Sequence, residues 1–464
     1  MIYTTEQLQI IYNEEKELFV EARAGTGKTT VLEGIARENF HLSILLLVFN
    51  KDIRKAAKII MPINVESHTI NSFAFKYYKN GALTKKQAGD KFLLKDNLSS
   101  FSILTTYLRH LPQDHNTLYL ADKISKSFNN LMDFNIKEID KEIDEIVQKI
   151  IFDMDKNRTP LTHNFILRDF LNNFDFTKFN YEHIIIDEAQ DLNGVMLEII
   201  KKIKNIKTTY VGDPLQSIYG FRGNIDIFNT AKDPLSLTGS FRMGKVLGDF
   251  IQKSTSIANN KKILFEGLNK EKGELIGETK NIIEVNNYEK LVIISRTNAN
   301  LFEQAFKYAK EGKNIAIPFE WEKIKSLIES VYYLRMGLLN SITSEHIKLY
   351  KTFDIFEKSI KRGTDIEFKF LLKLIKKEGI TLLDNLYLLE KHLSSNKYAD
   401  IICITAHKSK GLEFENVKIS NDFMKYCPQT KQEERNLVYV AITRASKKLY
   451  LNEDLTNILR RISK

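Results

Sequence analysis

The sequence predicts an α/β protein with two parallel-sheet lobes, each carrying a mainly helical insertion. Short apolar runs alternate with helical patterns, which is typical of parallel sheets covered on both faces. Two long stretches interrupt this alternation, residues 76–180 and 320–397, where apolar residues recur at helical spacing. The chain has 464 residues, of which 43% are hydrophobic and 28% charged, a composition that supports sizeable cores and excludes wholesale disorder.

The predicted strands fall into two sets. The first set lies at residues 18–20, 44–49, 183–186 and 208–211, and the second at 291–294, 314–317, 401–405, 417–419 and 449–451. In the second helical stretch, apolar side chains recur at Leu327, Ile328, Val331 and Leu334. We therefore expect the following organisation: a first lobe at 1–75 and 181–235, its insertion at 76–180, a second lobe at 236–319 and 398–464, and its insertion at 320–397.

Composition excludes several classes of protein. The longest aliphatic stretch, residues 44–49, is far shorter than the roughly 20 residues of a membrane span. Cys403 and Cys427 form no C-x-x-C pair, which excludes disulfide scaffolds and zinc ribbons. The first residues lack the pattern of a signal peptide, so we expect a cytoplasmic protein without a membrane partner. The net charge of +10 is by itself only a weak indication of nucleic-acid binding.

The run EARAGTGKTT at residues 21–30 follows a predicted strand and opens a predicted helix. Small residues in this position let backbone amides approach phosphates, and a helix N-terminus supports their negative charge. Lys28 would reach the β- and γ-phosphates of ATP, and the Thr29 hydroxyl would hold Mg²⁺. Alone, the string could also be an ordinary glycine-rich turn, since Ala22 replaces the usual first glycine. The predicted loop residues are Ala24, Gly25, Thr26, Gly27, Lys28, Thr29 and Thr30.

An acidic segment, HIIIDEAQD at residues 183–191, ends the third predicted strand. A carboxylate at the C-terminal edge of a parallel sheet is where a phosphate-bound Mg²⁺ needs a protein ligand. Asp187 suits the metal, and Glu188 can orient and deprotonate an attacking water. A solvated acidic turn is the alternative, but the two motifs together favour a nucleotide site.

The segment TTYVGDPLQSIYGFRG at residues 208–223 closely resembles motif III of the UvrD/Rep-type superfamily 1A DNA helicases. The other motifs of that family follow in order, with the Q motif at 4–7, I at 22–30, Ia at 45–51, Ib at 69–74, IV at 240–242, IVa at 295–298, V at 405–414 and VI at 435–445. Alanine is common in the family at the position of Ala22. The resemblance implies two RecA-like lobes of the P-loop NTPase class, with a second insertion of reduced size.

The resemblance also implies roles around the adenosine. Gln7 would read the adenine edge, Phe241 would stack on the ring, and Glu413 would contact the ribose. The plain alternative for Phe241 is a place in the core.

At the phosphates, the resemblance implies that Gln216 links the γ-phosphate to motif III. Arg242 and Arg444 would act as arginine fingers, which stabilise charge on the transferring phosphoryl group. The alternative for both arginines is a solvated ion pair on the surface.

Binding of single-stranded DNA needs aromatic platforms and polar or basic groups. Tyr219, Phe221 and Arg222 supply both kinds close to Gln216. Exposed polar residues at strand ends are common, so this part of the interpretation has a strong alternative. The sequence also departs from the family in having Asn71 for the usual histidine and an aromatic residue shifted by one position in motif Ia. We call the residues predicted to bind single-stranded DNA the DNA track. By resemblance, its other members would be Phe49, Asn50, Lys51, Thr69, Asn71, Arg296, Asn298 and His407.

These motifs predict an ATP-dependent DNA helicase or translocase that acts on single-stranded or tailed duplex DNA. The 3′→5′ direction rests on the resemblance alone. A second hypothesis, favoured by the reduced second insertion, is a DNA-stimulated ATPase that serves as a sensor in a larger complex with a nuclease or another protein partner. Compact UvrD-like proteins of this kind occur in Gabija-type antiphage systems. A third and weaker hypothesis is an RNA remodeller.

Overall fold

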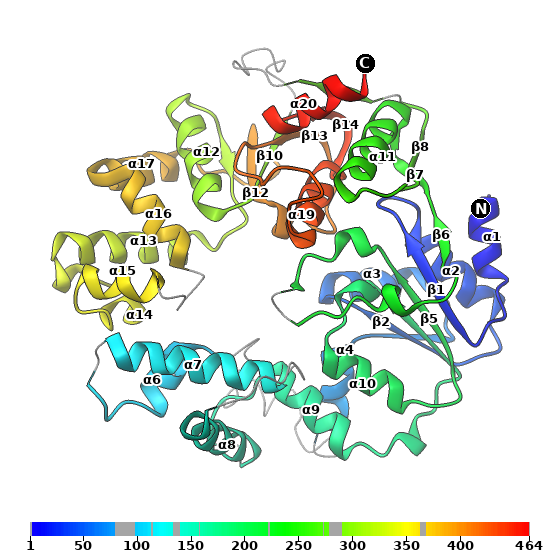
Figure 1. Cartoon of the computed structure of the whole chain (residues 1–464), viewed down its shortest axis with the longest axis horizontal. Helices are drawn as coiled ribbons and strands as arrows, with labels where there is room; N and C mark the ends of the chain where they lie inside the picture. Colours follow the sequence, from blue (N-terminus) through cyan, green and yellow to red (C-terminus); the bar gives the residue numbers. More distant parts are fainter. Residues whose placement is uncertain are drawn as a thin grey trace. The chain divides into compact units, whose positions relative to one another are not determined.

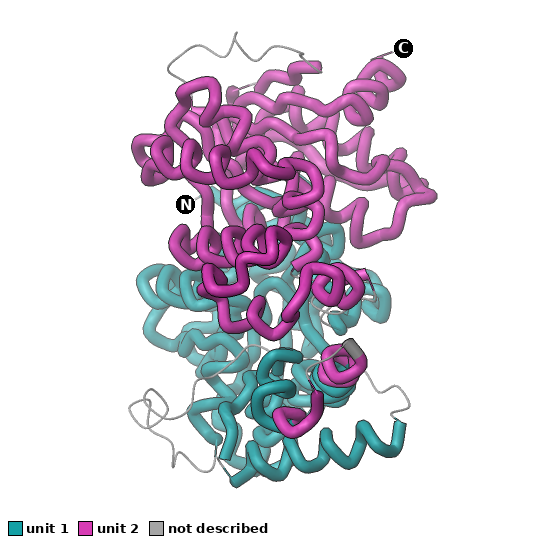
Figure 2. The backbone as a smooth tube through the Cα atoms, turned by 90° about the vertical axis from the view of Figure 1, so that its left-hand side faces the viewer, with its two compact units in different colours: residues 1–107, 123–239 teal, residues 108–122, 240–464 magenta. Residues whose placement is uncertain are grey.

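The protein consists of two compact units, each built around its own parallel sheet. The first unit comprises residues 1–107 and 123–239, and the second comprises 108–122 and 240–464 (Figure 2). The computed structural model describes residues 2–78, 98–112, 115–132, 140–156, 158–220, 223–271, 273–277, 290–361 and 368–463.

The first unit contains a six-stranded sheet with the order β3-β2-β4-β5-β1-β6, and every neighbouring pair is parallel. The four strands predicted for this lobe are confirmed. β3 and β6 were not predicted, because β3 (VESHT) is mostly polar and β6 has only three residues. The bounds are β1 Glu17–Ala22, β2 Ile44–Val48, β3 Val65–Thr69, β4 His183–Asp187, β5 Lys207–Gly212 and β6 Leu235–Leu237.

Helices connect these parallel strands, as parallel pairing requires. Their apolar faces join the strands in one core, to which α1 contributes Ile10 and Ile11 and α2 contributes Val31, Leu32 and Ile35, all nearly inaccessible to solvent. Figure 1 shows α1 and α2 beside β1 and β6. The helices next to the sheet are α1 Thr5–Ile11, α2 Lys28–Glu38, α3 Lys51–Ile60 and α10 Gly194–Lys202. Short 3-10 helices lie at Phe176–Lys178, Ala189–Asp191, Pro214–Gln216 and Ile227–Thr230.

The elements that the structure describes in the first helical stretch are helices, joined by turns and loops. Its aromatic base joins α4 to α9, with ring centroids 5.8 Å apart for Phe73 and Phe170 and 4.8 Å apart for Tyr77 and Phe174. The helices are α4 Ile70–Tyr77, α6 Ser100–Thr106, α7 His115–Met132, α8 Lys141–Asp155 and α9 His163–Asn173.

One carboxylate, that of Glu66 on β3, contacts both ends of this helical stretch. It accepts a hydrogen bond from the Tyr181 hydroxyl and lies 3.1 Å from Lys76 Nζ and 2.7 Å from His68 Nε2. Burial opposes the charged carboxylate, but the three hydrogen bonds outweigh it and lower the pKa of Glu66 to about 2. Glu66 therefore stays charged, and it connects the start of the helical stretch at Lys76 to the residue that follows its end, Tyr181.

The second unit contains another six-stranded parallel sheet, with the order β11-β12-β10-β13-β14-β9. All five strands predicted for this lobe are confirmed. The short β9 was not predicted, nor was the separate two-stranded sheet of β7 Gly239–Gly244 and β8 Glu266–Asn269. The strands are β9 Glu274–Ile276, β10 Leu291–Ser295, β11 Ile315–Ala316, β12 Ile401–Thr405, β13 Phe414–Ile419 and β14 Ala445–Tyr450. The helices are α11 Lys245–Asn259, α12 Asn298–Lys310, α18 Ala406–Ser409, α19 Gln432–Ile442 and α20 Glu453–Ile462.

In the described part of the second helical stretch the elements are likewise helices, joined by turns and loops. Glu390 on α17 fastens it to the start of α13, because its carboxylate accepts from Trp321 Nε1 at 3.0 Å and from Lys325 Nζ at 2.8 Å. The helices are α13 Trp321–Met336, α14 Glu345–Lys348, α15 Phe353–Lys361, α16 Lys369–Glu378 and α17 Leu382–Lys391, with 3-10 turns at Leu339–Ser341 and Gly379–Thr381.

A row of side chains connects α18 to the base of this second helical stretch. Lys408 Nζ lies 3.5 Å from the centroid of the Phe319 ring and donates to the Pro318 carbonyl at 2.7 Å. The Phe319 ring stacks on Phe302 of α12, which stacks on Phe370 of α16, with centroids 5.9 and 6.1 Å apart. An ammonium over a ring face is held by the ring quadrupole, so the row joins three helices through one segment.

Within the described ranges, every helix is too short or too polar to cross a lipid bilayer.

His183, the first residue of β4, makes the stability of the first unit depend on pH. Its ring is fully buried, and Nε2 lies 3.0 Å from Thr209 Oγ1. Burial, with the nearby charge of Lys207, lowers the pKa of His183 from 6.5 to about 4. When the pH falls from 6.5 to 4, His183 is therefore protonated in the unfolded chain but stays neutral in the folded chain, and the unfolding free energy falls.

We expect this group alone to cost about 2 kcal/mol of unfolding free energy when the pH falls from 7.5 to 5. His183→Gln keeps a polar group near Thr209 but does not titrate, so its unfolding free energy should change less over this range. Urea unfolding followed by circular dichroism at both pH values measures the difference. Equal pH dependence in the two proteins would contradict the assignment.

Candidate nucleotide site

The phosphate loop predicted at residues 21–30 joins the end of β1 to the start of α2. Gly25 and Gly27 have φ angles of 76° and 78°, in the left-handed region that glycine adopts without strain. Between them, the Thr26 hydroxyl donates to the Arg23 carbonyl at 2.8 Å and fixes the turn. The loop thus ends on the amides of the first turn of α2, an arrangement suited to bind phosphate.

The structure brings the predicted lysine and glutamate together. Lys28 Nζ lies 2.5 Å from Glu188 Oε1, and both side chains are mostly buried. Burial disfavours the ammonium, but the carboxylates of Glu188 and Asp187 offset this and raise the pKa of Lys28. Lys28 is therefore held as a cation at the mouth of the loop.

Glu188 is held in an unusual backbone conformation, with φ 55° and ψ 42°. A residue with a side chain adopts this region at a cost, and such residues cluster at functional sites. Gln190 Nε2 donates to Glu188 Oε2 at 2.6 Å and fixes the carboxylate from the other side. The predicted base is thus positioned by a lysine and an amide.

The predicted metal ligands offer oxygen atoms that fit Mg²⁺. Thr29 is exposed in the first turn of α2, and Asp187 is half-buried at the C-terminal end of β4. A hydroxyl and a carboxylate are hard donors, and Mg²⁺ bound with a nucleotide takes few protein ligands. Among the described residues no group of three or more His, Cys, Asp or Glu side chains could hold a metal ion.

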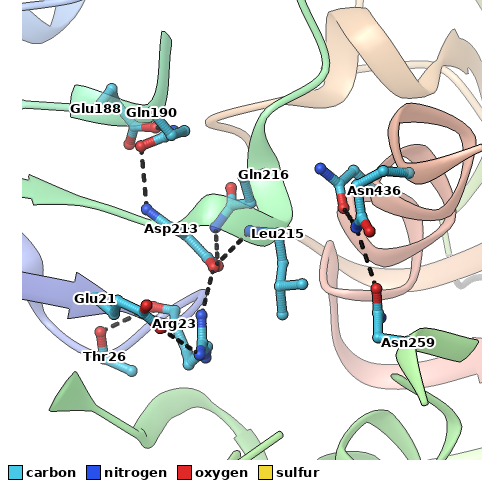
Figure 3. A network of polar contacts seen from close by, with 11 residues as sticks. Glu21, Arg23, Thr26, Glu188, Gln190, Asp213, Leu215, Gln216, Asn259 and Asn436 are labelled. Carbon is cyan, nitrogen blue, oxygen red and sulfur yellow. Dashed lines mark hydrogen bonds and ion pairs between the residues drawn. The ribbon is translucent and has the colours of Figure 1, made fainter. Parts of the chain in front are cut away.

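Asp213, which follows β5, is the centre of a buried network (Figure 3). Its backbone amide donates to Gln190 Oε1 at 3.0 Å. Its carboxylate accepts from Arg23 Nη1 at 3.0 Å, from Gln216 Nε2 at 2.9 Å and from the Leu215 amide at 3.2 Å. The phosphate loop, the end of β4 and the segment after β5 therefore meet at one residue.

Sequence reasoning missed three members of this network: Arg23, Gln190 and Asp213. Two signals were available in the sequence. Arg23 is a large cation between two alanines, and Asp213 is an acidic residue shortly after the strand predicted at 208–211. A buried charge needs a partner, but the sequence does not say which one.

Gln7 ties α1 to the phosphate loop. It forms a capping box with Thr4, with bonds of 3.2 and 3.0 Å between side chains and backbone amides. Its Nε2 donates to the Thr26 carbonyl at 3.3 Å. Glu6 accepts from the amide and hydroxyl of Thr238 at 2.8 and 2.6 Å. The role of Gln7 in reading the adenine edge stays a prediction.

In the second unit, the structure places three predicted residues side by side. Arg242 Nε lies 2.9 Å from Glu413 Oε2, and its Nη1 donates to the Thr443 carbonyl at 2.9 Å. The neighbouring Phe241 is 47% exposed, which excludes the core position considered for it. An exposed ring beside a held arginine is compatible with stacking on a base.

Arg444 is almost completely buried in the second unit, at 1% exposure. Its guanidinium donates to the carbonyls of Val440 and Leu412 at 2.9 and 3.0 Å and to Thr443 Oγ1 at 2.9 Å. The arginine therefore does not belong to an exposed ion pair, and it fastens the end of α19 to the segment before β13. Its predicted role as an arginine finger stays a prediction.

Two of the aromatic residues predicted to bind DNA lie together in the first unit. The Phe49 and Tyr219 rings stack with centroids 5.6 Å apart and planes 13° apart, and Phe49 is 39% exposed. Phe49 comes directly after β2, so its shifted position in motif Ia still brings it to Tyr219. Phe221 and Arg222 lie outside the described residues.

Several polar residues predicted on the DNA track have structural contacts. Asn50 caps α3 by accepting from two backbone amides, and Thr69 caps α4 by accepting from the Ser72 amide at 3.1 Å. Lys51 is exposed in the first turn of α3. The buried Oδ1 of Asn71 has no hydrogen-bond partner within the part of the chain that the structure describes.

In the second unit, Arg296 forms a two-pronged ion pair with Glu434, with distances of 2.7 and 2.5 Å. Hydrogen bonding to this carboxylate raises the pKa of Arg296. Asn298 begins α12 and His407 lies in α18, and both are half-buried. The structure thus places these residues at the C-terminal ends of β10 and β12.

Two parallel α/β sheets and a glycine-rich loop that leads into a helix, with an acidic strand end beside it, define a P-loop NTPase. A family model described as the UvrD/REP helicase N-terminal domain matches residues 3–236, and one described as the UvrD-like helicase C-terminal domain matches residues 400–452. The chain belongs to the UvrD/Rep helicase family.

Curated relatives match across nearly the whole chain. F-box DNA helicase protein 1 of Schizosaccharomyces pombe is 27% identical over 520 residues, which cover 98% of this chain and 58% of the relative. F-box DNA helicase 1 of Gallus gallus is 25% identical over 522 residues, with 98% and 49% covered. A probable DNA helicase II homolog of Mycoplasma capricolum is 24% identical over 452 residues, with 82% and 61% covered. The chain thus spans about half to six-tenths of the length of these relatives.

Substitutions should separate the role of Lys28 in nucleotide binding from the role of Glu188 in hydrolysis. Lys28→Ala removes the cation expected at the phosphates and should abolish ATP turnover and weaken nucleotide binding. Glu188→Gln keeps the size of the side chain but removes its basicity, so ATP should still bind while hydrolysis stops. Fluorescent-nucleotide binding and phosphate release measure the two steps.

Glu198→Gln, on the exposed face of α10, is a matched control that should turn over ATP like the unsubstituted protein. Full hydrolysis by Glu188→Gln would contradict the assigned role.

Proposed function

We propose that the protein is an ATP-dependent DNA helicase or translocase that moves on single-stranded DNA. The observation that carries this proposal is the continuity within the first unit between the phosphate loop, Asp213 and Gln216. Tyr219, stacked on Phe49, follows Gln216 by three residues. Membership of the UvrD/Rep family and the names of its DNA-helicase relatives support the same activity.

ATP with Mg²⁺ is the proposed energy source. Thr29 and Asp187 would hold the metal ion, which neutralises phosphate charge when bound. Lys28 would bind the β- and γ-phosphates, and in doing so it would exchange its contact with Glu188 for one with the nucleotide. Glu188, still held by Gln190, would then accept a proton from the attacking water.

The second lobe would supply the remaining groups. Arg242 and Arg444 would stabilise charge on the transferring phosphoryl group, with Phe241 and Glu413 on the adenosine. Each round of ATP hydrolysis would then alternate two arrangements of the lobes and advance the DNA in a short step. The proposed direction, 3′→5′, and the proposed cytoplasmic location rest on the family resemblance and the sequence.

The decisive experiment combines ATP turnover with strand displacement. We expect single-stranded DNA to stimulate ATP hydrolysis, and a duplex with a 3′ tail to be unwound more readily than one with a 5′ tail. Single-stranded RNA of the same length should stimulate hydrolysis less. ATP hydrolysis that no DNA stimulates would contradict the proposal.

The same experiment separates the motor from a sensor. Stimulated hydrolysis without displacement or translocation would favour a DNA-responsive ATPase that works within a larger complex, such as an antiphage system with a nuclease. Copurification of a nuclease with the tagged protein from its own cells would then identify the complex.

The Phe49 and Tyr219 pair should contribute to DNA affinity. Stacking of a base on an aromatic side chain is worth about 1–3 kcal/mol, so Tyr219→Ala or Phe49→Ala should weaken binding of oligo(dT) about tenfold. Tyr219→Phe keeps the ring and should bind like the unsubstituted protein. Fluorescence anisotropy of a labelled oligonucleotide measures the affinities.

Phe40→Ala is the matched control, because Phe40 is an exposed aromatic residue of the same unit, two residues past the C-terminal end of α2. Equal losses in Phe40→Ala and Phe49→Ala would show that the effect is not stacking at the predicted track.

A further inference from the structure

The proposed function gives the Arg23 side chain no role of its own, although its bond to Asp213 connects the phosphate loop to Gln216. Arg23 lies two residues after Glu21 in the phosphate loop, and it is 8% exposed. Its Nη2 lies 2.8 Å from Glu21 Oε2 and its Nη1 lies 3.0 Å from Asp213 Oδ1. One planar guanidinium therefore holds two carboxylates, one on β1 and one after β5 (Figure 3).

Asp213 shares its carboxylate between Arg23 and Gln216, the residue predicted to link the γ-phosphate to motif III. Oδ1 faces Arg23, while Oδ2 accepts from Gln216 Nε2 at 2.9 Å. A shift of the guanidinium would therefore move the acceptor that positions the Gln216 amide. Through its backbone amide, Asp213 also holds Gln190, which holds Glu188.

The backbone of Arg23 adds two further connections. Its carbonyl accepts from the Thr26 hydroxyl within the phosphate loop, and its amide donates to the Leu237 carbonyl of β6 at 3.0 Å. Leu237 lies two residues before Gly239, where the first unit ends and β7, which carries Phe241 and Arg242, begins. Arg23 thus contacts the loop, the segment after β5 and the strand that leads out of the unit.

We propose that Arg23 is a positioning residue that couples the phosphate loop to Gln216 and, through the following residues, to the DNA-binding Tyr219. This inference rests on the proposed function. It assigns to Arg23 the transmission of DNA binding to the rate of ATP hydrolysis, rather than binding of ATP itself. The guanidinium fork is essential to this role, because a single ammonium cannot hold both carboxylates in one fixed geometry.

A purely structural role makes a different prediction. Asp213 is completely buried, and a buried carboxylate without a cation is strongly destabilising. If Arg23 only neutralises this charge, removal of both charges together should restore normal behaviour. Asparagine at position 213 retains an oxygen that can accept from Gln216 and the Leu215 amide.

The test compares Arg23→Lys, Arg23→Met and the double variant Arg23→Met/Asp213→Asn. ATP hydrolysis is measured over a range of ATP concentrations with and without single-stranded oligo(dT), and affinity for a fluorescent ADP analogue is measured without DNA. Thermal unfolding reports whether each variant folds.

We expect the DNA-stimulated kcat to fall about tenfold in Arg23→Met and in the double variant, with an intermediate loss in Arg23→Lys. The KM for ATP and the affinity for the ADP analogue should change less than about threefold, because the Arg23 guanidinium holds the carboxylates of Glu21 and Asp213. If Arg23→Met does not fold, the lysine and double variants carry the same comparison.

Recovery of full DNA stimulation in the double variant, or its retention in Arg23→Lys, would overturn the coupling role. If DNA does not stimulate ATP hydrolysis by the unsubstituted protein, the proposed function is overturned, and this inference with it.

Discussion

The arrangement of the first unit depends on one buried carboxylate. Asp213 is inaccessible to solvent, yet it carries bonds from Arg23, Gln216 and the Leu215 amide. Taking a carboxylate out of water costs several kcal/mol, which only well-directed donors offset. The folded unit must therefore bring the phosphate loop and the segment after β5 together. The geometry of the nucleotide site is in this sense a consequence of satisfying Asp213.

Much of the fold could be predicted because buried parallel strands have mostly apolar sequences without polar alternation. Ile44–Val48, His183–Ile186 and Ile401–Thr405 are of this kind, and each is a strand. β3 escaped prediction because its polar residues serve the Glu66 contacts and the cap of α4. β6 and β9 have three residues each, too few to show a period.

The candidate site could be predicted only in part. The phosphate loop and the acidic end of β4 are local strings, and the strand ends of a parallel sheet share one edge. The pairing of Arg23 with Asp213 joins residues far apart in the chain, so no spacing rule reveals it. The caps formed by Asn50 and Thr69 were also hidden, since the same residue types serve helix ends and DNA backbones.

Trp321 is the only tryptophan of the chain, and it stands at the first turn of α13. Its indole donates to Glu390, and it follows by two residues the Phe319 ring that Lys408 covers. Indole emission depends on hydrogen bonding and on the polarity around the ring. The protein thus carries a native optical reporter at the base of its second helical stretch, and changes at this junction can be followed in the unlabelled protein.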